Sequence, residues 1–184
     1  EKYERYAIAH KLVGAIVHGI PNRVHTYFVP ANSAKVKGSN LTIEVLQRTL
    51  WKEQERRKAI GAMWPEVLYL QLDNTTSENK NKYVFAYLSS LIQKGVFREI
   101  HLNFLPVGHT HDDIDKFFSQ FAHRMRAVDC FTYEDAVKVL QKCHDPTHQV
   151  LEETDYLFAL HEWRSWISQD LNEAYQGFLK QAYH

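Results

Sequence analysis

Two clusters of polar side chains in this sequence have residue types that can do chemistry. The first is "HTHDDID", residues 109–115, which places two histidines and three aspartates in seven positions. The second is "LDNTTSEN", in which Asp73 follows an apolar segment. Carboxylate oxygens are the ligands that Mg²⁺ and Mn²⁺ prefer, and histidine adds a nitrogen ligand or a proton acceptor. We therefore expect a divalent-metal site that combines the two clusters.

Helical geometry selects the candidate ligands within the first cluster. If a helix begins near His111, then at 100° per residue His111, Asp112 and Asp115 lie within about 100° of arc. His111 and Asp115 are four residues apart, so both can bind one ion. Asp113 falls on the far side, toward solvent. The apolar residues of this helix occupy an adjoining arc that would face the core: Ile114, Phe117, Phe118 and Phe121.

Both clusters also have a plain structural explanation. Aspartates in the first turn of a helix are favoured by capping and by the helix dipole, which accounts for Asp112 and Asp113. Asp73, followed by Asn74 and Thr75, is typical of a turn closed by an Asx hydrogen bond. The two clusters together favour a site, because each of them follows a predicted strand.

The elements that must position these residues alternate along the chain. Two β-rich segments, residues 12–20 and 23–29, predict a hairpin across Pro21. The apolar run of residues 66–73 predicts a central, buried strand. The remaining predicted elements are helices over 41–61, 82–95, 113–125 and 132–143, a strand over 99–107 and a helical tail over 156–181.

This order of strands and helices is typical of an α/β fold. In open α/β sheets the functional groups collect beyond the carboxyl ends of the strands. Asp73 and residues 109–115 follow two consecutive strands at that end. We therefore expect the carboxylates of Asp73 and of Asp112 or Asp115 to lie about 4–7 Å apart, the separation of groups that share metal ions.

Three basic residues near the candidate site are expected to contact a nucleic-acid backbone. Lys80 and Lys82 belong to "ENKNK", shortly after Asp73, and Arg124 belongs to "HRMR", at the end of the helix predicted over 113–125. Phosphate contacts of this kind position a nucleic acid without reading its sequence. Capping and surface placement explain the two lysines equally well, and a positive charge suits the carboxyl end of a helix.

Length and composition set limits on the class of protein. The 184 residues are enough for one domain with its own core. Lys+Arg and Asp+Glu are both 22, so nucleic-acid binding requires a local patch of charge. Cys130 and Cys143 form no CxxC pair, and no apolar run of about 18 residues is present. We expect an intracellular protein with no membrane partner. Because the chain opens on Glu1, we also expect a fragment or a processed product.

Four sequence blocks resemble, in order, those of an uncharacterised eukaryotic domain family found mainly in proteins of mobile-element origin. The family looks like a divergent DDE transposase domain of the ribonuclease H-like fold, and the resemblance runs over residues 12–128. It implies a ribonuclease H-like mixed sheet flanked by helices in residues 1–128, with a helical C-terminal extension, residues 129–184, packed on the same domain. The blocks are "VGAIVHG", "SNLTIEVLQRTL", "LYLQLDNTTSENKNKYVFAYLSSL" and "FLPVGHTHDDIDKFFSQF".

The resemblance also implies a catalytic centre. Ribonuclease H-like nucleases place one acid on the first strand, a second at the end of the fourth strand and a third on the helix after the fifth. Asp73 matches the second acid, and Asp112 or Asp115 the third. "HTHD" resembles a run of RuvC-type nucleases. By this resemblance, His109 would lie near the attacking water. Such carboxylates hold two Mg²⁺ or Mn²⁺ ions about 4 Å apart.

The same resemblance implies the partner and the place of action. The partner would be a nucleic acid, DNA in preference to RNA, and the place of action the nucleus. A homo-oligomer is compatible with this function. The reaction would be nucleic-acid cleavage or strand transfer.

The first acid of this pattern is missing from the sequence. The predicted strands 12–20 and 23–29 contain no Asp or Glu, and relatives place an Asp-containing strand upstream of residue 1. We therefore expect that the first strand is missing and that the chain lacks full activity. A domesticated or degenerate copy that binds or scaffolds without catalysis is the alternative.

A second alternative is a metallohydrolase that uses the "HTHDD" motif. His109, His111 and Asp113 resemble part of the HxHxDH motif of the metallo-β-lactamase fold, but Ile114 stands where the last histidine belongs. "GHTH" also resembles the last motif of the calcineurin-like phosphoesterases. The upstream motifs of that family are absent from the sequence.

Overall fold

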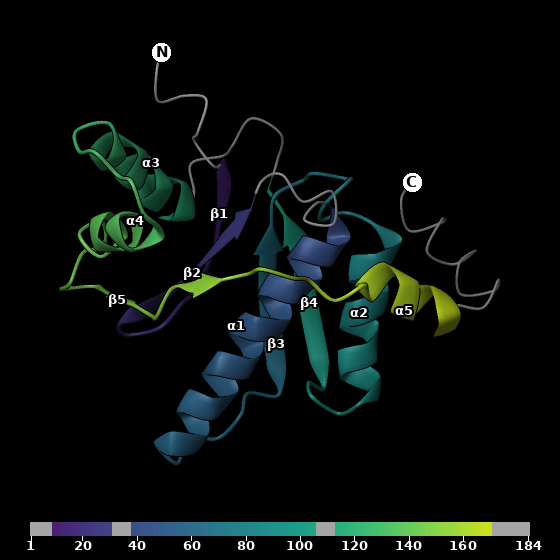
Figure 1. Cartoon of the computed structure of the whole chain (residues 1–184). Coiled ribbons are helices and arrows are strands. Elements are labelled where there is room, and N and C mark those ends of the chain that lie inside the picture. Colours follow the sequence, from purple (N-terminus) through teal and green to yellow (C-terminus); the bar gives the residue numbers. More distant parts are fainter. Residues whose placement is uncertain (1–8, 31–37, 106–112, 171–184) are drawn as a thin grey trace. The chain divides into compact units, whose positions relative to one another are not determined.

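The computed structural model describes residues 9–30, 38–105 and 113–170 (Figure 1). The chain divides into two compact units, each of which is described by itself. Unit 1 consists of Glu1–Asn32 and His109–Phe158, and unit 2 consists of Ser33–Gly108 and Ala159–His184. Each unit is therefore built from two segments that are far apart in the sequence.

Unit 1 contains a mixed sheet built around the predicted hairpin. Strands β1 (His10–Val17) and β2 (Asn22–Pro30) pair antiparallel, and the register runs from His10 opposite Pro30 to Val17 opposite Arg23. Two short strands, β5 (Gln149–Leu151) and β6 (Asp155–Tyr156), pair parallel with β2. The hairpin prediction is confirmed, and β2 is the middle strand of this sheet because it pairs on both of its edges.

Two helices of unit 1 cover an apolar cluster, α3 (Asp113–Met125) and α4 (Tyr133–Leu140). Helix α4 begins with a capping box, in which the Thr132 hydroxyl and the Asp135 carboxylate each accept a backbone N–H of the other residue. The spacing of the two residues, three positions apart in the sequence, is that of a capping box. The buried residues of the cluster are Val24, Phe28, Phe117, Ala136, Leu140 and Cys143.

Unit 2 pairs two parallel strands with three helices. Strands β3 (Val67–Leu72) and β4 (Glu99–Phe104) lie side by side in register. Helices α1 (Ser39–Ala59), α2 (Lys82–Gln93) and α5 (Trp163–Asp170) pack with them around a second core. The buried residues of this core are Ile43, Leu46, Val84, Ala86, Tyr87, Leu88, Leu91, Phe97 and Ile167.

Strand β3 differs from the central, buried strand that its apolar run predicts. Its leucines, Leu68, Leu70 and Leu72, pack on the core, but Tyr69 is 74% exposed and Gln71 is exposed as well. Among the described residues β3 pairs with β4 alone. Successive side chains of β3 therefore point alternately toward the core and toward solvent. The solvent side, the open face of β3, carries tyrosine and glutamine, which tolerate water better than leucine does.

The α/β class is confirmed, and so is the predicted order of strands and helices up to α4. The extension over residues 129–184, which was expected to be helical, also contains β5 and β6, because pairing with β2 satisfies the backbone groups of these segments. The described residues form five helices and six strands, and a mixed sheet is flanked by helices. No helix in residues 9–30, 38–105 or 113–170 is long and apolar enough to cross a membrane.

Candidate functional site

Asp73 lies at the carboxyl end of β3, where it opens a tight turn. Its Oδ1 accepts the backbone N–H of Thr75 (2.9 Å) and the side-chain amide of Asn79 (2.6 Å). The Asx turn that was one of the two explanations of Asp73 is therefore present. The side chain is exposed, so the carboxylate is both held in one orientation and accessible from solvent.

Asn79 connects this turn to helix α1. Its side-chain oxygen accepts a hydrogen bond from the Thr42 hydroxyl (2.9 Å), which also donates to the carbonyl of Glu78 (3.1 Å). The backbone N–H groups of Asn79 and Lys80 both donate to the Thr75 carbonyl. These bonds hold the Asp73 turn on the first turns of α1, so two segments that are distant in sequence set the position of the carboxylate.

The rest of the "ENKNK" segment also has structural roles. The Asn81 side chain caps α2 by accepting the N–H groups of Tyr83 (3.1 Å) and Val84 (3.2 Å), as an N-cap asparagine is expected to do. The ammonium of Lys80 lies 5.5 Å from the Phe104 ring centroid, and that of Lys82 lies 5.1 Å from the Tyr83 ring centroid. Both lysines are half-buried cations over aromatic faces.

The parallel pairing of β3 and β4 makes their carboxyl ends adjacent. Leu72 pairs with Phe104, and the N–H of Leu105 donates to the carbonyl of Leu72 (3.0 Å). Asp73 follows one strand end, and residues 106–112 follow the other. His109, His111 and Asp112 of the predicted site lie outside the described residues, and for them the site stays a prediction.

The described part of the first cluster lies on α3, in unit 1. Phe117 is buried, and Ile114, Phe118 and Phe121 pack on the same core, which confirms the predicted apolar face of the helix. Asp115, whose predicted arc adjoins this apolar face, is exposed, as Asp113 is. Arg124, in the last turn of α3, is also exposed.

The predicted approach of Asp73 to Asp115 stays untested, because the two residues belong to different units. Within residues 9–30, 38–105 and 113–170, no three side chains of His, Cys, Asp or Glu gather as a metal ion would need. Of the predicted ligands, only Asp73 and Asp115 belong to these residues. The oriented, exposed carboxylate of Asp73 is the described group that fits a hard cation best, because carboxylate oxygens are the ligands of such ions.

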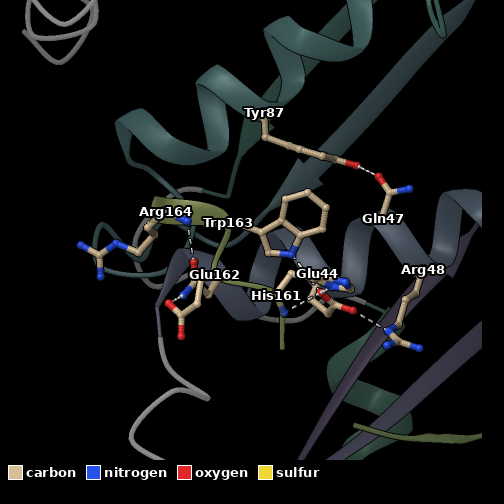
Figure 2. A network of polar contacts seen from close by, with 9 residues as sticks. Glu44, Gln47, Arg48, Tyr87, His161, Glu162, Trp163 and Arg164 are labelled. Atoms are coloured by element: carbon tan, nitrogen blue, oxygen red, sulfur yellow. Dashed lines mark hydrogen bonds and ion pairs between the residues drawn. The ribbon is translucent and has the colours of Figure 1, made fainter. Parts of the chain in front are cut away.

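Unit 2 contains a buried polar network that was not predicted from the sequence. Glu44 of α1 is 2% exposed, and Figure 2 shows the groups that surround its carboxylate. Oε1 accepts from Arg48 Nε (2.7 Å), and Oε2 accepts from the indole N–H of Trp163 (2.9 Å). His161 places its Nδ1 2.8 Å from Oε2 and its backbone N–H 3.3 Å from it. This carboxylate therefore binds the segment before α5 to α1.

The same segment makes further contacts with α1 and α2. Asn40 donates to the Glu162 carboxylate (3.3 Å) and accepts the backbone N–H of Arg164 (2.9 Å). The Arg164 guanidinium lies 4.8 Å from the Tyr83 ring centroid. The run "HEWR", residues 161–164, thus contacts its neighbours with every residue (Figure 2). A glutamate within the apolar face of α1 was the one sequence signal that could have revealed it.

A family model matches the sequence over residues 1–183, and that family is described as a domain of unknown function. No curated protein and no solved structure matches the chain. The match covers both units and all the residues of the candidate site.

Proposed function

The chain belongs to the DUF7869 family, and on that premise we propose that it is a transposase-like domain for divalent-metal-dependent cleavage or strand transfer of nucleic acid. The fold that we propose for it is ribonuclease H-like. Its substrate would be DNA in preference to RNA, its place of action the nucleus, and its relatives proteins of mobile-element origin. A homo-oligomer is compatible with this proposal.

One observation carries the proposal: the strand ends that precede the two polar clusters are adjacent. Because β3 and β4 are parallel and in register, Asp73 and the chain that leads to residues 109–115 leave the same edge of the sheet. Ligand-binding groups of α/β proteins gather at such edges. This supports a shared role for Asp73 and the "HTHDD" cluster in chemistry, although their spacing in the sequence is large.

The residues of the site fit Mg²⁺ or Mn²⁺. When bound, such ions activate a nucleophile and stabilise the leaving oxygen of a phosphodiester. Asp73, Asp112 and Asp115, with His111, would hold the metal, and His109 would accept a proton. Asn79 would keep the Asp73 carboxylate in its orientation, since it donates to Oδ1. Lys80 and Lys82 would contact phosphates of the substrate.

A second function is favoured by the turn at Asp73. The N–H of Thr75 and the amide of Asn79 satisfy Oδ1 without any metal, so the residue is also explained as a structural one. A transposase-derived domain that binds nucleic acid without cleaving it would keep this turn and lose metal binding. The two functions therefore differ in their response to divalent cations.

Thermal unfolding with and without Mn²⁺ separates the two functions. A ligand that binds only the folded chain with a millimolar dissociation constant stabilises it by about 1.4 kcal/mol at about 10 mM, which raises the melting temperature by about 3–6 °C. We expect Asp73→Asn and Asp115→Asn to abolish this rise. Asparagine preserves an Asx turn, so without metal the Asp73→Asn chain should melt close to the wild type.

Two matched controls complete the experiment. Asp145 opens a similar turn, with its Oδ1 accepting the N–H of Thr147 (3.0 Å), and Asp145→Asn should keep the full response to Mn²⁺. Asp113→Asn should keep it too, because the helical wheel turns Asp113 away from Asp115. A wild-type melting curve that Mn²⁺ leaves unchanged would end the metal-dependent proposal in favour of the binding domain.

A further inference from the structure

After Asp115, the exposed side chains of α3 that can carry a charge are all basic. Lys116, His123 and Arg124 are exposed, and at 100° per residue they lie within about 100° of arc over a rise of about 12 Å. Arg126 follows the helix and is exposed as well. Between Asp115 and Asp129 the sequence has no acidic residue. These four residues, the basic strip, therefore bring three cationic side chains and one histidine to a short segment of a chain whose net charge, with histidine neutral, is zero.

The basic strip has no partner in the described part of the chain. No ion pair there involves Lys116, His123, Arg124 or Arg126. The helix dipole explains positive charge in the last turn of α3, but Lys116 lies in the first described turn, where the dipole disfavours a cation. Helix stability alone therefore does not account for the strip.

An exposed aromatic ring follows the basic strip. The turn after α3 folds back on the helix, because the Cys130 thiol lies 3.4 Å from the sulfur of Met125. The next residue, Phe131, is 80% exposed. Phe131 immediately precedes the cap of α4, where an apolar residue often packs against the helix, but its exposure shows that the ring is not packed in this way. Phe131 thus adds an exposed aromatic ring five residues after Arg126, and base stacking on such rings accompanies phosphate contacts in proteins that bind single strands.

We propose that the basic strip and Phe131 bind single-stranded nucleic acid, with the cations on successive phosphates and a base stacked on the Phe131 ring. The inference deepens the proposed function, on which it rests, by naming the surface and the form of the substrate. Exposed cations attract a phosphate backbone, and an aromatic ring accepts any base because every base has a flat face. The strip starts one residue after Asp115, so the bound strand would extend from the start of α3 toward the start of α4.

Binding is measured by fluorescence anisotropy with a labelled deoxythymidine oligonucleotide of about 15 nucleotides, which exceeds most single-strand site sizes. EDTA is present throughout, so the result does not depend on the metal site. The charge variant is Lys116→Gln, Arg124→Gln and Arg126→Gln combined. Its matched control removes the same charge elsewhere, by Lys58→Gln, Lys94→Gln and Lys142→Gln.

The charge variant should bind about tenfold or more weakly at about 50 mM KCl, and the slope of log K against log salt should fall by about 2, since each phosphate contact contributes about 0.7 for a single strand. The control should change neither value by a comparable amount. Phe131→Ala should weaken binding about fivefold or more. Phe158→Ala removes a ring of the same type that is 81% exposed, and it should not.

Three results would overturn the proposal. The first is a wild-type chain that does not bind the oligonucleotide. The second is a charge variant that binds as well as its control. The third combines two observations: polyglutamate at equal charge concentration displaces the oligonucleotide, and the Phe131→Ala chain binds like the Phe158→Ala chain. Together they would show that the surface binds an acidic protein. Loss of the Mn²⁺ response with retained binding would count against the metal site alone.

Discussion

The carboxylates of Asp73 and Glu44, both in unit 2, differ in burial. Asp73 is exposed and holds a turn, whereas Glu44 is 2% exposed and is surrounded by hydrogen-bond donors. Burial by itself raises the pKa of Glu44, but the hydrogen bonds from His161, Trp163 and Arg48 outweigh burial and lower the pKa below its usual 4.5. The ionised form of Glu44 is therefore part of the folded structure, while the Asp73 carboxylate is in contact with solvent.

This difference predicts how Glu44 contributes to stability. A carboxyl group with a lowered pKa stabilises the fold above its unfolded pKa of 4.5, and the contribution is lost as the pH falls through the folded pKa. Glu44→Gln should therefore cost about 1–3 kcal/mol at neutral pH, and the variant should lose less stability than the wild type below that pKa. Urea unfolding at several pH values measures both effects.

Glu55 supplies the control for this experiment. It lies on the same helix, is about half exposed and pairs with Lys58 (2.7 Å). Exposed pairs contribute little, so Glu55→Gln should cost less than about 1 kcal/mol. Equal losses of unfolding free energy in Glu44→Gln and Glu55→Gln would show that the network around Glu44 adds no stability of its own.

The position of α3 depends on a glycine of β1. A Cβ atom at Gly14 would lie 2.8 Å from Cδ1 of Ile114 and 3.0 Å from Cζ of Phe118. Gly14 belongs to the block "VGAIVHG", and the two side chains belong to the face of α3 that carries the core contacts. The close approach of a strand and a helix therefore explains why this strand position has no side chain. It also sets where α3 presents Asp115 and the basic strip.

Gly14→Ala should destabilise unit 1. The added methyl group must displace Ile114 and Phe118, and overpacking of this kind costs about 1–3 kcal/mol. Gly19→Ala is the matched control, because a Cβ atom there would meet only the Pro21 carbonyl at 3.5 Å, an ordinary contact. Thermal unfolding of the two variants tests the packing, and a Gly14→Ala chain as stable as the Gly19→Ala chain would contradict it.

At the scale of the whole molecule, two apolar cores share no residue. The core of unit 1 contains Phe117 and Leu140, and the core of unit 2 contains Val84 and Leu88. Each unit joins an early and a late segment of the chain. Local damage to one core should therefore loosen the unit that contains it before the other.

Two leucine truncations test this independence. Leu140→Ala and Leu88→Ala each remove a buried side chain, and each should cost about 2–5 kcal/mol. Hydrogen exchange should rise mainly in β1, β2, α3 and α4 for Leu140→Ala, and mainly in α1, α2, β3 and β4 for Leu88→Ala. The same rise in both units for either variant would show a single cooperative structure.

The sequence by itself determined the features that depend on neighbours along the chain. The hairpin, the capping box of α4, the apolar face of α3 and the order of strands and helices up to α4 all follow from residue types a few positions apart. The turn at Asp73, which was one of the two explanations of that residue, also follows from neighbours in sequence, because an Asx hydrogen bond spans two residues.

Only the tertiary structure decided the features that join distant segments. Asn79 bonds both Asp73 and Thr42, and Glu44 is buried by His161 and Trp163, more than a hundred residues away. The open face of β3 likewise depends on which elements pack against it. No local pattern encodes such contacts, because a side chain's burial and partners are set by whichever segment the fold brings against it.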